Sequence, residues 1–317
     1  MIGIAHRAWG IRKSANATNS KEDPMNQLIG ICLIILSAVS FGTMAIFAVF
    51  ASATGVTVES MLFLRFGIAA VMMLPIALLQ KRRFPNGRDL LILIGMGVFG
   101  YAGMSFCYFT ALTIIPPSLV AALLYLYPVF VAVLSVLFLN ETFTRNRLTA
   151  LALAVSGAVL VIGVEFTGHI HGILLGITAA VIYSVYTIVG ASVMQRNDAF
   201  TSSFVIIASA GTFYLLYSLG SGFFVPPTPG TWLNIIAIAV ISTVVAIYAY
   251  FQGMKYTGAV NAAMLSTFEP VTTMVLTSWV LGVHISPSQM AGASLIILSA
   301  IVVVIRTRRI SASVQKN

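Results

Sequence analysis

Ten long apolar runs follow one another along this chain, with only short polar connections between them. The hydrocarbon core of a bilayer requires roughly 20 apolar residues per helix, which is about the length of each run. Charged residues make up 8% of the sequence, whereas soluble globular proteins carry about 25%. We therefore predict an all-α membrane protein with ten transmembrane helices. The predicted helices span 27–50, 59–80, 90–112, 116–139, 147–164, 172–194, 201–224, 232–254, 258–282 and 286–306.

The distribution of Lys and Arg predicts which side of the membrane each connection faces, because cytoplasmic connections are enriched in these residues. With a cytoplasmic N-terminus, 16 of the 17 basic residues fall in cytoplasmic connections or tails, and the remaining one, Arg65, lies inside a helix. We expect a multi-pass protein of the cytoplasmic (inner) membrane with both termini in the cytoplasm. Topology and anionic lipid headgroups then account for the net charge of +9 without a nucleic-acid partner.

The second half of the chain repeats the first half at one constant offset, which places Gly30 on Gly172. This repeat register continues without gaps over five helices, which chance matching between apolar segments would not maintain. We interpret it as the duplication of a five-helix unit. Further identical pairs in the same register include Ala38 and Ala180, Tyr108 and Tyr250, and Pro128 and Pro270.

The odd number of helices in each repeat determines how the repeats are related. If the first unit enters the membrane from the cytoplasm, the second must enter from outside. The two units are then related by a pseudo-two-fold axis in the membrane plane, an architecture that recurs in secondary transporters. The start of translation stays open between Met1 and Met25. The predicted organisation is a cytosolic tail over 1–26, a first repeat over 27–164, a second repeat over 165–306 and a basic cytosolic tail over 307–317.

A set of residues in the first repeat forms a pattern, namely Tyr108, Ala111, Leu112, Ala121, Ala122, Tyr127, Pro128, Asn140, Glu141, Thr142 and Gly157. Together with Arg65 and Phe66, this pattern resembles the EamA-type domain of the drug/metabolite transporter superfamily. The resemblance covers 27–306 as two successive domains. It implies a ten-helix inverted-repeat carrier with a central cavity, and substrates such as amino acids, amines or other metabolites. The second copy departs from the pattern, because Val283 stands where the first copy has Glu141.

Two prolines occupy equivalent positions near the middle of predicted helices, Pro128 in the fourth and Pro270 in the ninth. Proline removes a backbone hydrogen bond and clashes with the preceding turn. Paired breaks in corresponding segments of two repeats indicate a transport site. The alternative is a kink that only shapes the bundle.

Glu269 directly precedes Pro270 and lies near the predicted bilayer midplane. A charge at that depth costs on the order of 3 kcal/mol on insertion scales. Glu269 is therefore a candidate for proton coupling or for binding a substrate ammonium group, and the alternative is a structural carboxylate that is protonated or paired with Arg. Asn261 precedes Glu269 by eight residues, a spacing that places both on one helix face and predicts a polar stripe.

Arg65 has three possible roles: it binds a substrate carboxylate, pairs with Glu269, or extends towards the membrane surface. Four tyrosines within the predicted helices are candidates for a cavity wall, although aromatic side chains also serve as ordinary packing material. These are Tyr101, Tyr108, Tyr127 and Tyr250.

The sequence predicts a secondary transporter that moves a small polar metabolite, such as an amino acid or amine, by alternating access, and we favour export. The alternatives are an intramembrane lipid-modifying enzyme and a channel or receptor. We identify no catalytic constellation, metal cluster or ATP-binding motif in the sequence, so we expect no enzyme activity, metal or cofactor. The expected partners are a small-molecule substrate, membrane lipids and protons.

Overall fold

The computed structural model describes residues 24–139, 144–163, 169–222 and 225–314, and over these ranges it contains helices and no strands. Nine helices in the described part are long and apolar enough to cross a membrane, and each matches a predicted helix. The remaining predicted helix, 258–282, is present as two shorter helices, α15 (Ala259–Ser266) and α16 (Phe268–Leu281). The chain is thus an all-α membrane protein of ten helical segments, as predicted.

The helix boundaries agree with the predicted ones to within three residues, except at the end of the chain. There the last helix continues to Val314, through residues predicted to be a tail. The first repeat contains α3 (Pro24–Gly42), α4 (Met44–Ser52), α5 (Val58–Leu79), α6 (Gly87–Gly95), η1 (Met96–Ala102), α7 (Gly103–Leu112), α8 (Pro117–Leu124), α9 (Tyr127–Leu139) and α10 (Arg145–Ile162). The second repeat contains α11 (Ile170–Val193), α12 (Ala199–Ser221), α13 (Pro229–Ala239), η2 (Val240–Val245), α14 (Ala246–Thr257), α15, α16 and α17 (Pro287–Val314).

The fourth segment of each repeat is interrupted at an equivalent place. Tyr125 lies between α8 and α9, and Thr267, its equivalent in the repeat register, separates α15 from α16. Pro128 and Pro270 follow in the first turn of the helix that restarts. A proline is tolerated there because its missing N–H would have no helical partner. The chain therefore breaks just before each proline and does not bend at the proline itself.

The third segment of each repeat contains a π-helical stretch, η1 in the first repeat and η2 in the second. The two stretches overlap when the repeats are aligned in the repeat register. Such wide turns are rare in helices, and those that do occur are often found at functional sites. Gly97 in η1 packs so closely on α12 that an added Cβ would lie 2.5 Å from the carbonyl oxygen of Ile206.

Contacts between the repeats occur in symmetric pairs. A Cβ added to Gly30 would lie 2.9 Å from the Thr257 side chain, and one added to the equivalent Gly172 would lie 2.7 Å from Ile115, the equivalent of Thr257. Helices α10 and α17 also pack on each other and are equivalent in the repeat register. An operation that places the first repeat on the second must therefore also place the second on the first, and a two-fold rotation does this. Because each repeat crosses the membrane five times, this axis lies in the membrane plane, and the repeats are inverted.

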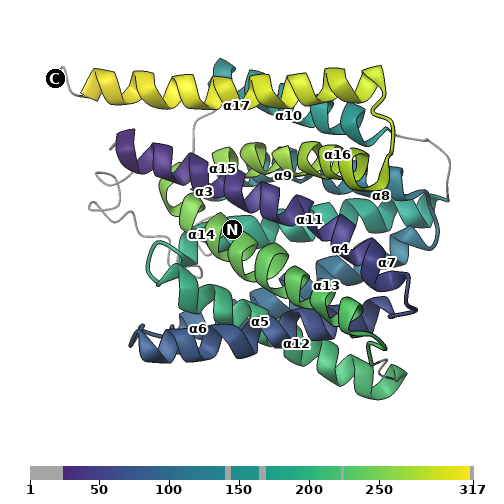
Figure 1. Cartoon of the computed structure of the whole chain (residues 1–317). Helices are drawn as coiled ribbons and strands as arrows, with labels where there is room; N and C mark the ends of the chain where they lie inside the picture. The colour runs from purple at the N-terminus through teal and green to yellow at the C-terminus, as the bar shows by residue number, and fades with distance from the viewer. Residues whose placement is uncertain (1–23, 140–143, 164–168, 223–224, 315–317) are drawn as a thin grey trace.

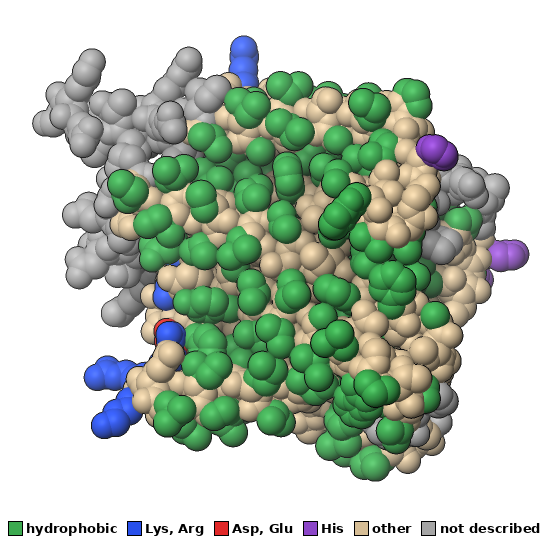
Figure 2. Space-filling view, viewed as in Figure 1, with side chains coloured by type: hydrophobic (Ala, Val, Ile, Leu, Met, Phe, Trp, Pro, Cys, Tyr) green, Lys and Arg blue, Asp and Glu red, His purple; other side chains and the backbone are tan. Residues whose placement is uncertain are grey.

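Figure 1 shows how the segments are layered. Helices α10 and α17 lie side by side along the top edge, α5 and α12 pack together along the opposite edge, and α3 packs on α14 between them. Large apolar side chains cover the face seen in Figure 2. Among the most exposed are Leu79 and Trp279, at 83% and 82% of their full surface. A lipid-facing surface explains this exposure, whereas a water-exposed one would not.

Charge distinguishes the two ends of the bundle. In Figure 2 the visible Lys and Arg side chains lie towards the left and the His side chains lie at the right. Helix α3 begins and α17 ends on the left in Figure 1. We refer to the end that carries Arg82, Arg196 and Lys255 as the basic end. Glu141 and the segment 1–23 lie outside the described residues.

Candidate functional site

Arg65 is buried within the bundle, with 4% of its surface exposed. Its Nε donates a hydrogen bond to the Thr243 hydroxyl at 2.6 Å, and its Nη2 donates to the Tyr101 hydroxyl at 2.9 Å and to the Ser242 carbonyl oxygen at 3.2 Å. The side chain therefore does not extend to the membrane surface, which corrects one of the roles considered from the sequence.

The two hydroxyls that hold Arg65 come from equivalent residues of the two repeats, because the repeat register places Tyr101 on Thr243. One comes from η1 and the other from η2. The Thr243 hydroxyl also donates to the carbonyl oxygen of Ile238, five residues earlier, which is the spacing of a π-turn. The wide turns thus direct matching side chains towards one cation near the pseudo-two-fold axis.

The network around Arg65 continues to the first helical segment. The Thr43 and Ser242 hydroxyls are 3.0 Å apart, and Thr43 is the residue at which α3 gives way to α4. Sequence reasoning missed Thr43, Ser242 and Thr243. The repeat register alone could have identified Thr243, as the partner of Tyr101.

Glu269 lies in the first turn of α16, directly after the interruption at Thr267. It is half-buried. The partial positive charge of a helix N-terminus stabilises a carboxylate at this position. The equivalent residue in the first repeat is Tyr127, which also directly precedes a proline. The two interrupted segments therefore place a carboxylate and a phenol at matching positions.

The surroundings of Glu269 include several of the predicted residues. Its carboxylate interacts with the Tyr125 hydroxyl, and it is close enough for electrostatic interaction with Arg65 and Tyr108. Glu269 is not among the hydrogen-bond partners of Arg65, so the two charges share a region without forming a direct pair. Tyr108 is half-buried and packs edge-on against Phe109 at 5.7 Å between ring centroids.

Tyr127 connects the interrupted segments of the two repeats. Its hydroxyl donates to the carbonyl oxygen of Ala263 in α15 at 3.2 Å, and the Ser184 hydroxyl donates to the Tyr127 carbonyl oxygen at 3.1 Å. Tyr127 is the first residue of α9, so these two bonds fix the start of this helix to α15 and α11. The Tyr127 ring meets Tyr183 with 4.7 Å between centroids.

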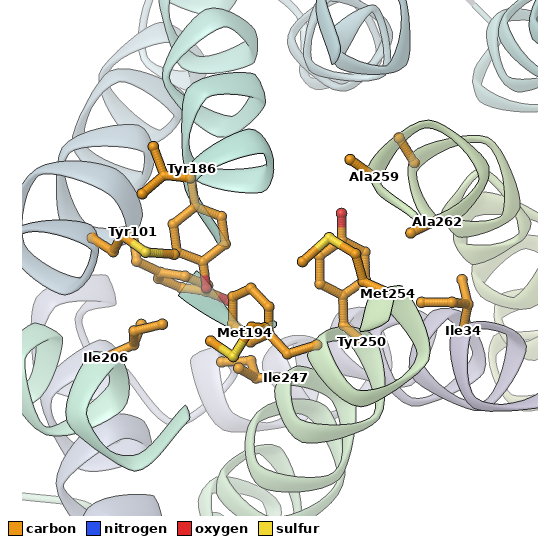
Figure 3. Packing of buried hydrophobic residues seen from close by; sticks show 14 of the residues in the cluster. Ile34, Tyr101, Tyr186, Met194, Ile206, Ile247, Tyr250, Met254, Ala259 and Ala262 are labelled. Carbon is orange, nitrogen blue, oxygen red and sulfur yellow. The ribbon is translucent and has the colours of Figure 1, made fainter. Parts of the chain in front are cut away.

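An aromatic cluster extends from this point across the interior. Tyr101 and Tyr186 have ring centroids 6.0 Å apart, and the Tyr250 hydroxyl lies 3.3 Å from that of Thr187. Figure 3 shows Tyr101, Tyr186 and Tyr250, from three different segments, lying in the interior around one central region. Phenols there combine apolar surface with hydroxyls that bond polar groups.

Asn261 differs from the other candidates. Its side-chain amide donates to the carbonyl oxygen of Thr257, the last residue of α14, at 3.0 Å. The interruption at Thr267 separates it from Glu269, and the intervening Leu265 is buried at 2% exposure. The continuous polar stripe predicted from a straight helix is therefore not formed.

Ten helical segments in two inverted repeats, with a polar interior at interrupted helices, define an inverted-repeat membrane transport protein. A family model described as the EamA-like transporter family matches residues 28–163 and 170–305, which correspond to the two repeats. The chain belongs to this family. It is thus a transporter, and the alternative of an intramembrane enzyme is set aside.

Several transporters are similar to this chain in sequence. An uncharacterized transporter of Archaeoglobus fulgidus is 27% identical over 273 residues, covering 86% of this chain and 95% of the relative. The pseudopaline exporter CntI of Pseudomonas aeruginosa is 27% identical over 214 residues, 67% of this chain and 74% of that exporter. The aromatic amino acid exporter YddG of Ancylobacter novellus is 26% identical over 189 residues, 57% of this chain and 64% of that exporter.

The fold is also similar to that of a solved structure. A crystal structure of a protein with 22% sequence identity aligns with a TM-score of 0.73, over 90% of this chain and 99% of the other. The likeness extends over both repeats, so it supports the ten-segment architecture as a whole.

Proposed function

We propose that this protein is a secondary transporter that exports a small polar metabolite, an amino acid, an amine or a related compound, across the cytoplasmic membrane by alternating access. The observation that carries this proposal is the presence of Arg65 and Glu269 in one interior region, where interrupted helices of both repeats meet. Arg65 and Glu269 carry opposite charges and do not pair directly, so together they can bind a substrate that has both a carboxylate and an ammonium group.

The basic end faces the cytoplasm in this proposal, because cytoplasmic connections are the ones enriched in Lys and Arg. The export direction is supported by two relatives that are named exporters, one for aromatic amino acids and one for pseudopaline. Arg65 contacts a substrate carboxylate, and Glu269 binds a substrate ammonium group or a coupling proton. Tyr101, Tyr108, Tyr127 and Tyr250 contribute to the wall around them, and Asn261 has at most a secondary role.

Counterflow in proteoliposomes tests the proposal. Purified protein is reconstituted with an unlabelled metabolite inside, and uptake of the same labelled compound is measured over a panel of amino acids, polyamines and neutral sugars. We expect counterflow for at least one compound that carries an amino group. Uptake confined to sugars, or absent across the panel, would contradict the proposed substrate class.

A further inference from the structure

Two connections that belong to different repeats are bound together at the basic end. Arg196, in the connection between α11 and α12, forms an ion pair with Asp89 in the first turn of α6, with 2.8 Å between Nη2 and Oδ1. The Asn197 amide donates to the same carboxylate at 2.7 Å. Lys255, at the end of α14, donates to the Asn197 carbonyl oxygen at 3.0 Å. The connection between α11 and α12 is thus bound to both α6 and α14.

A second ion pair lies beside the first. The Arg82 Nη1 is 3.1 Å from Oδ2 of Asp198 and 3.3 Å from Oδ1. Asp198 also caps α12 by accepting from the Thr201 amide, and the Arg82 guanidinium lies 4.8 Å from the centre of the Phe200 ring. The four charged side chains are 22–39% exposed, so water screens them only in part.

The opposite end of the molecule offers an internal comparison. The repeat register relates Asp89 to Thr231 and Arg196 to Thr54. Thr231 donates a hydrogen bond to Thr54 at 3.1 Å, so the same contact exists at both ends. At the basic end it is an ion pair, whereas at the other end it joins two neutral hydroxyls. Because the two-fold axis relates the positions, the two ends share the backbone arrangement at this contact and differ in its side-chain chemistry.

We propose that Asp89, Arg196, Arg82 and Asp198 form an ionic latch that holds the basic end closed, and that the conformational equilibrium therefore favours states closed at this end. The inference rests on the proposed alternating access. In such a cycle the repeats separate at one end while they close at the other. Charge-assisted contacts are roughly twice as strong as neutral ones, so opening the basic end disrupts more interaction than opening its counterpart. Substrate binding from the basic end must then compensate for opening the latch.

Accessibility of a buried reporter measures the equilibrium directly. Met194, at the end of α11 beneath the latch, is fully buried, and Figure 3 places it in the packed interior. The reporter Met194→Cys is made in a Cys32→Ala, Cys107→Ala background and reconstituted in lipid nanodiscs. Its rate of reaction with a hydrophilic maleimide is compared with and without Asp89→Asn and Arg82→Gln. We expect labelling about fivefold faster without the latch.

Three controls make the result specific. Thr231→Val, which alters the equivalent contact at the opposite end, should not accelerate labelling. Exchanging the charges, Asp89→Arg with Arg196→Asp, should return labelling towards the slow rate, which a merely unfolded variant would not do. Raising the salt concentration from 0.15 M to about 1 M shortens the screening length from about 8 Å to about 3 Å, so it should accelerate labelling with the latch intact and have little effect without it.

The outcomes separate the latch from the proposed function. Equal labelling rates in the presence and absence of the latch, at both salt concentrations, would overturn the latch even if counterflow is active. Faster labelling in the latch variants of a protein that shows no counterflow would support the latch as a conformational device and reject the proposed substrate class.

Discussion

Arg65 shows how the interior site depends on single residues. A buried guanidinium must have its donors satisfied, because an unpaired charge in the membrane interior is costly. Here the partners are Tyr101 and Thr243, equivalent residues of the two repeats. One cation thus binds both halves of the molecule, so any relative movement of the halves must rearrange these bonds or carry the guanidinium with one of them.

Replacing Arg65 with Lys tests this role. Lys retains the charge but lacks the planar fork, so it cannot reach all three acceptors at once. We expect the midpoint of thermal unfolding in detergent to fall by roughly 4 °C, and counterflow to fall at least tenfold. Tyr101→Phe, which removes a single acceptor, should have a smaller effect on both. An Arg65→Lys protein with wild-type stability and transport would show that the three hydrogen bonds are dispensable.

At the scale of the helices, the packing of α10 on α17 depends on small residues. A Cβ added to Gly157 would lie 2.7 Å from the carbonyl oxygen of Gly292. In the repeat register Gly157 corresponds to Ser299 and Gly292 to Ala150. The matching contact is a hydrogen bond of 2.8 Å from the Ser299 hydroxyl to the carbonyl oxygen of Ala150. Backbone lies at the point of contact, so a larger residue can be accommodated only if the helices move apart. Small residues of this kind permit close helix association in membranes.

Gly157→Ala should therefore destabilise the protein by about 1–3 kcal/mol through overpacking. The matched control is Gly95→Ala at the end of α6, where an added Cβ meets no atom within 4 Å. Alanine is the better helix former, so the control should be neutral or slightly stabilising. Thermal unfolding of the two variants in the same detergent measures the difference. Equal unfolding midpoints would indicate that the α10–α17 contact does not constrain the fold.

Helix positions and the repeat were accessible from the sequence because both follow from the apolar pattern and the register. The local irregularities were less accessible. The prolines indicated which segments are interrupted, but the breaks occur earlier, at Tyr125 and Thr267, where each helix restarts with proline in its first turn. The π-turns of η1 and η2 gave no sequence signal, because their geometry depends on tertiary partners such as Arg65. The stripe through Asn261 was predicted from a straight helix that the chain does not form.

At the scale of the whole molecule, the two ends have the same backbone arrangement because the repeats are inverted. The two ends therefore differ in their side chains. Basic residues such as Arg82, Arg196 and Lys255 lie at one end, and the equivalents of the Arg196–Asp89 ion pair at the other end are the hydroxyls of Thr54 and Thr231. The site around Arg65 and Glu269 lies between these ends. Surface charge then determines the orientation in the membrane under the positive-inside rule, and the end contacts bias the conformational equilibrium.

Reporter fusions test the orientation. A reporter inserted after residues 81–83 should indicate the cytoplasm, and one inserted after 226–229 should indicate the exterior, because the positive-inside rule places the basic connection inside. Alkaline phosphatase, which is active only outside, and a fluorescent protein, which matures inside, provide opposite readouts at each position. The reverse result at either site would contradict the orientation.

The most direct test of the account is gradient-driven transport by Glu269→Gln. The substitution retains the side chain's size but removes its ability to titrate or to attract a cation strongly, and burying an amide costs less than burying a charge. The protein should therefore remain expressed and monodisperse. In proteoliposomes with an imposed pH gradient, we predict that the wild-type protein accumulates substrate and that Glu269→Gln does not, although exchange of bound substrate persists if Glu269 carries only the coupling proton. Wild-type accumulation with an unchanged pH profile in Glu269→Gln would contradict the central claim that this carboxylate binds the substrate ammonium group or the coupling proton.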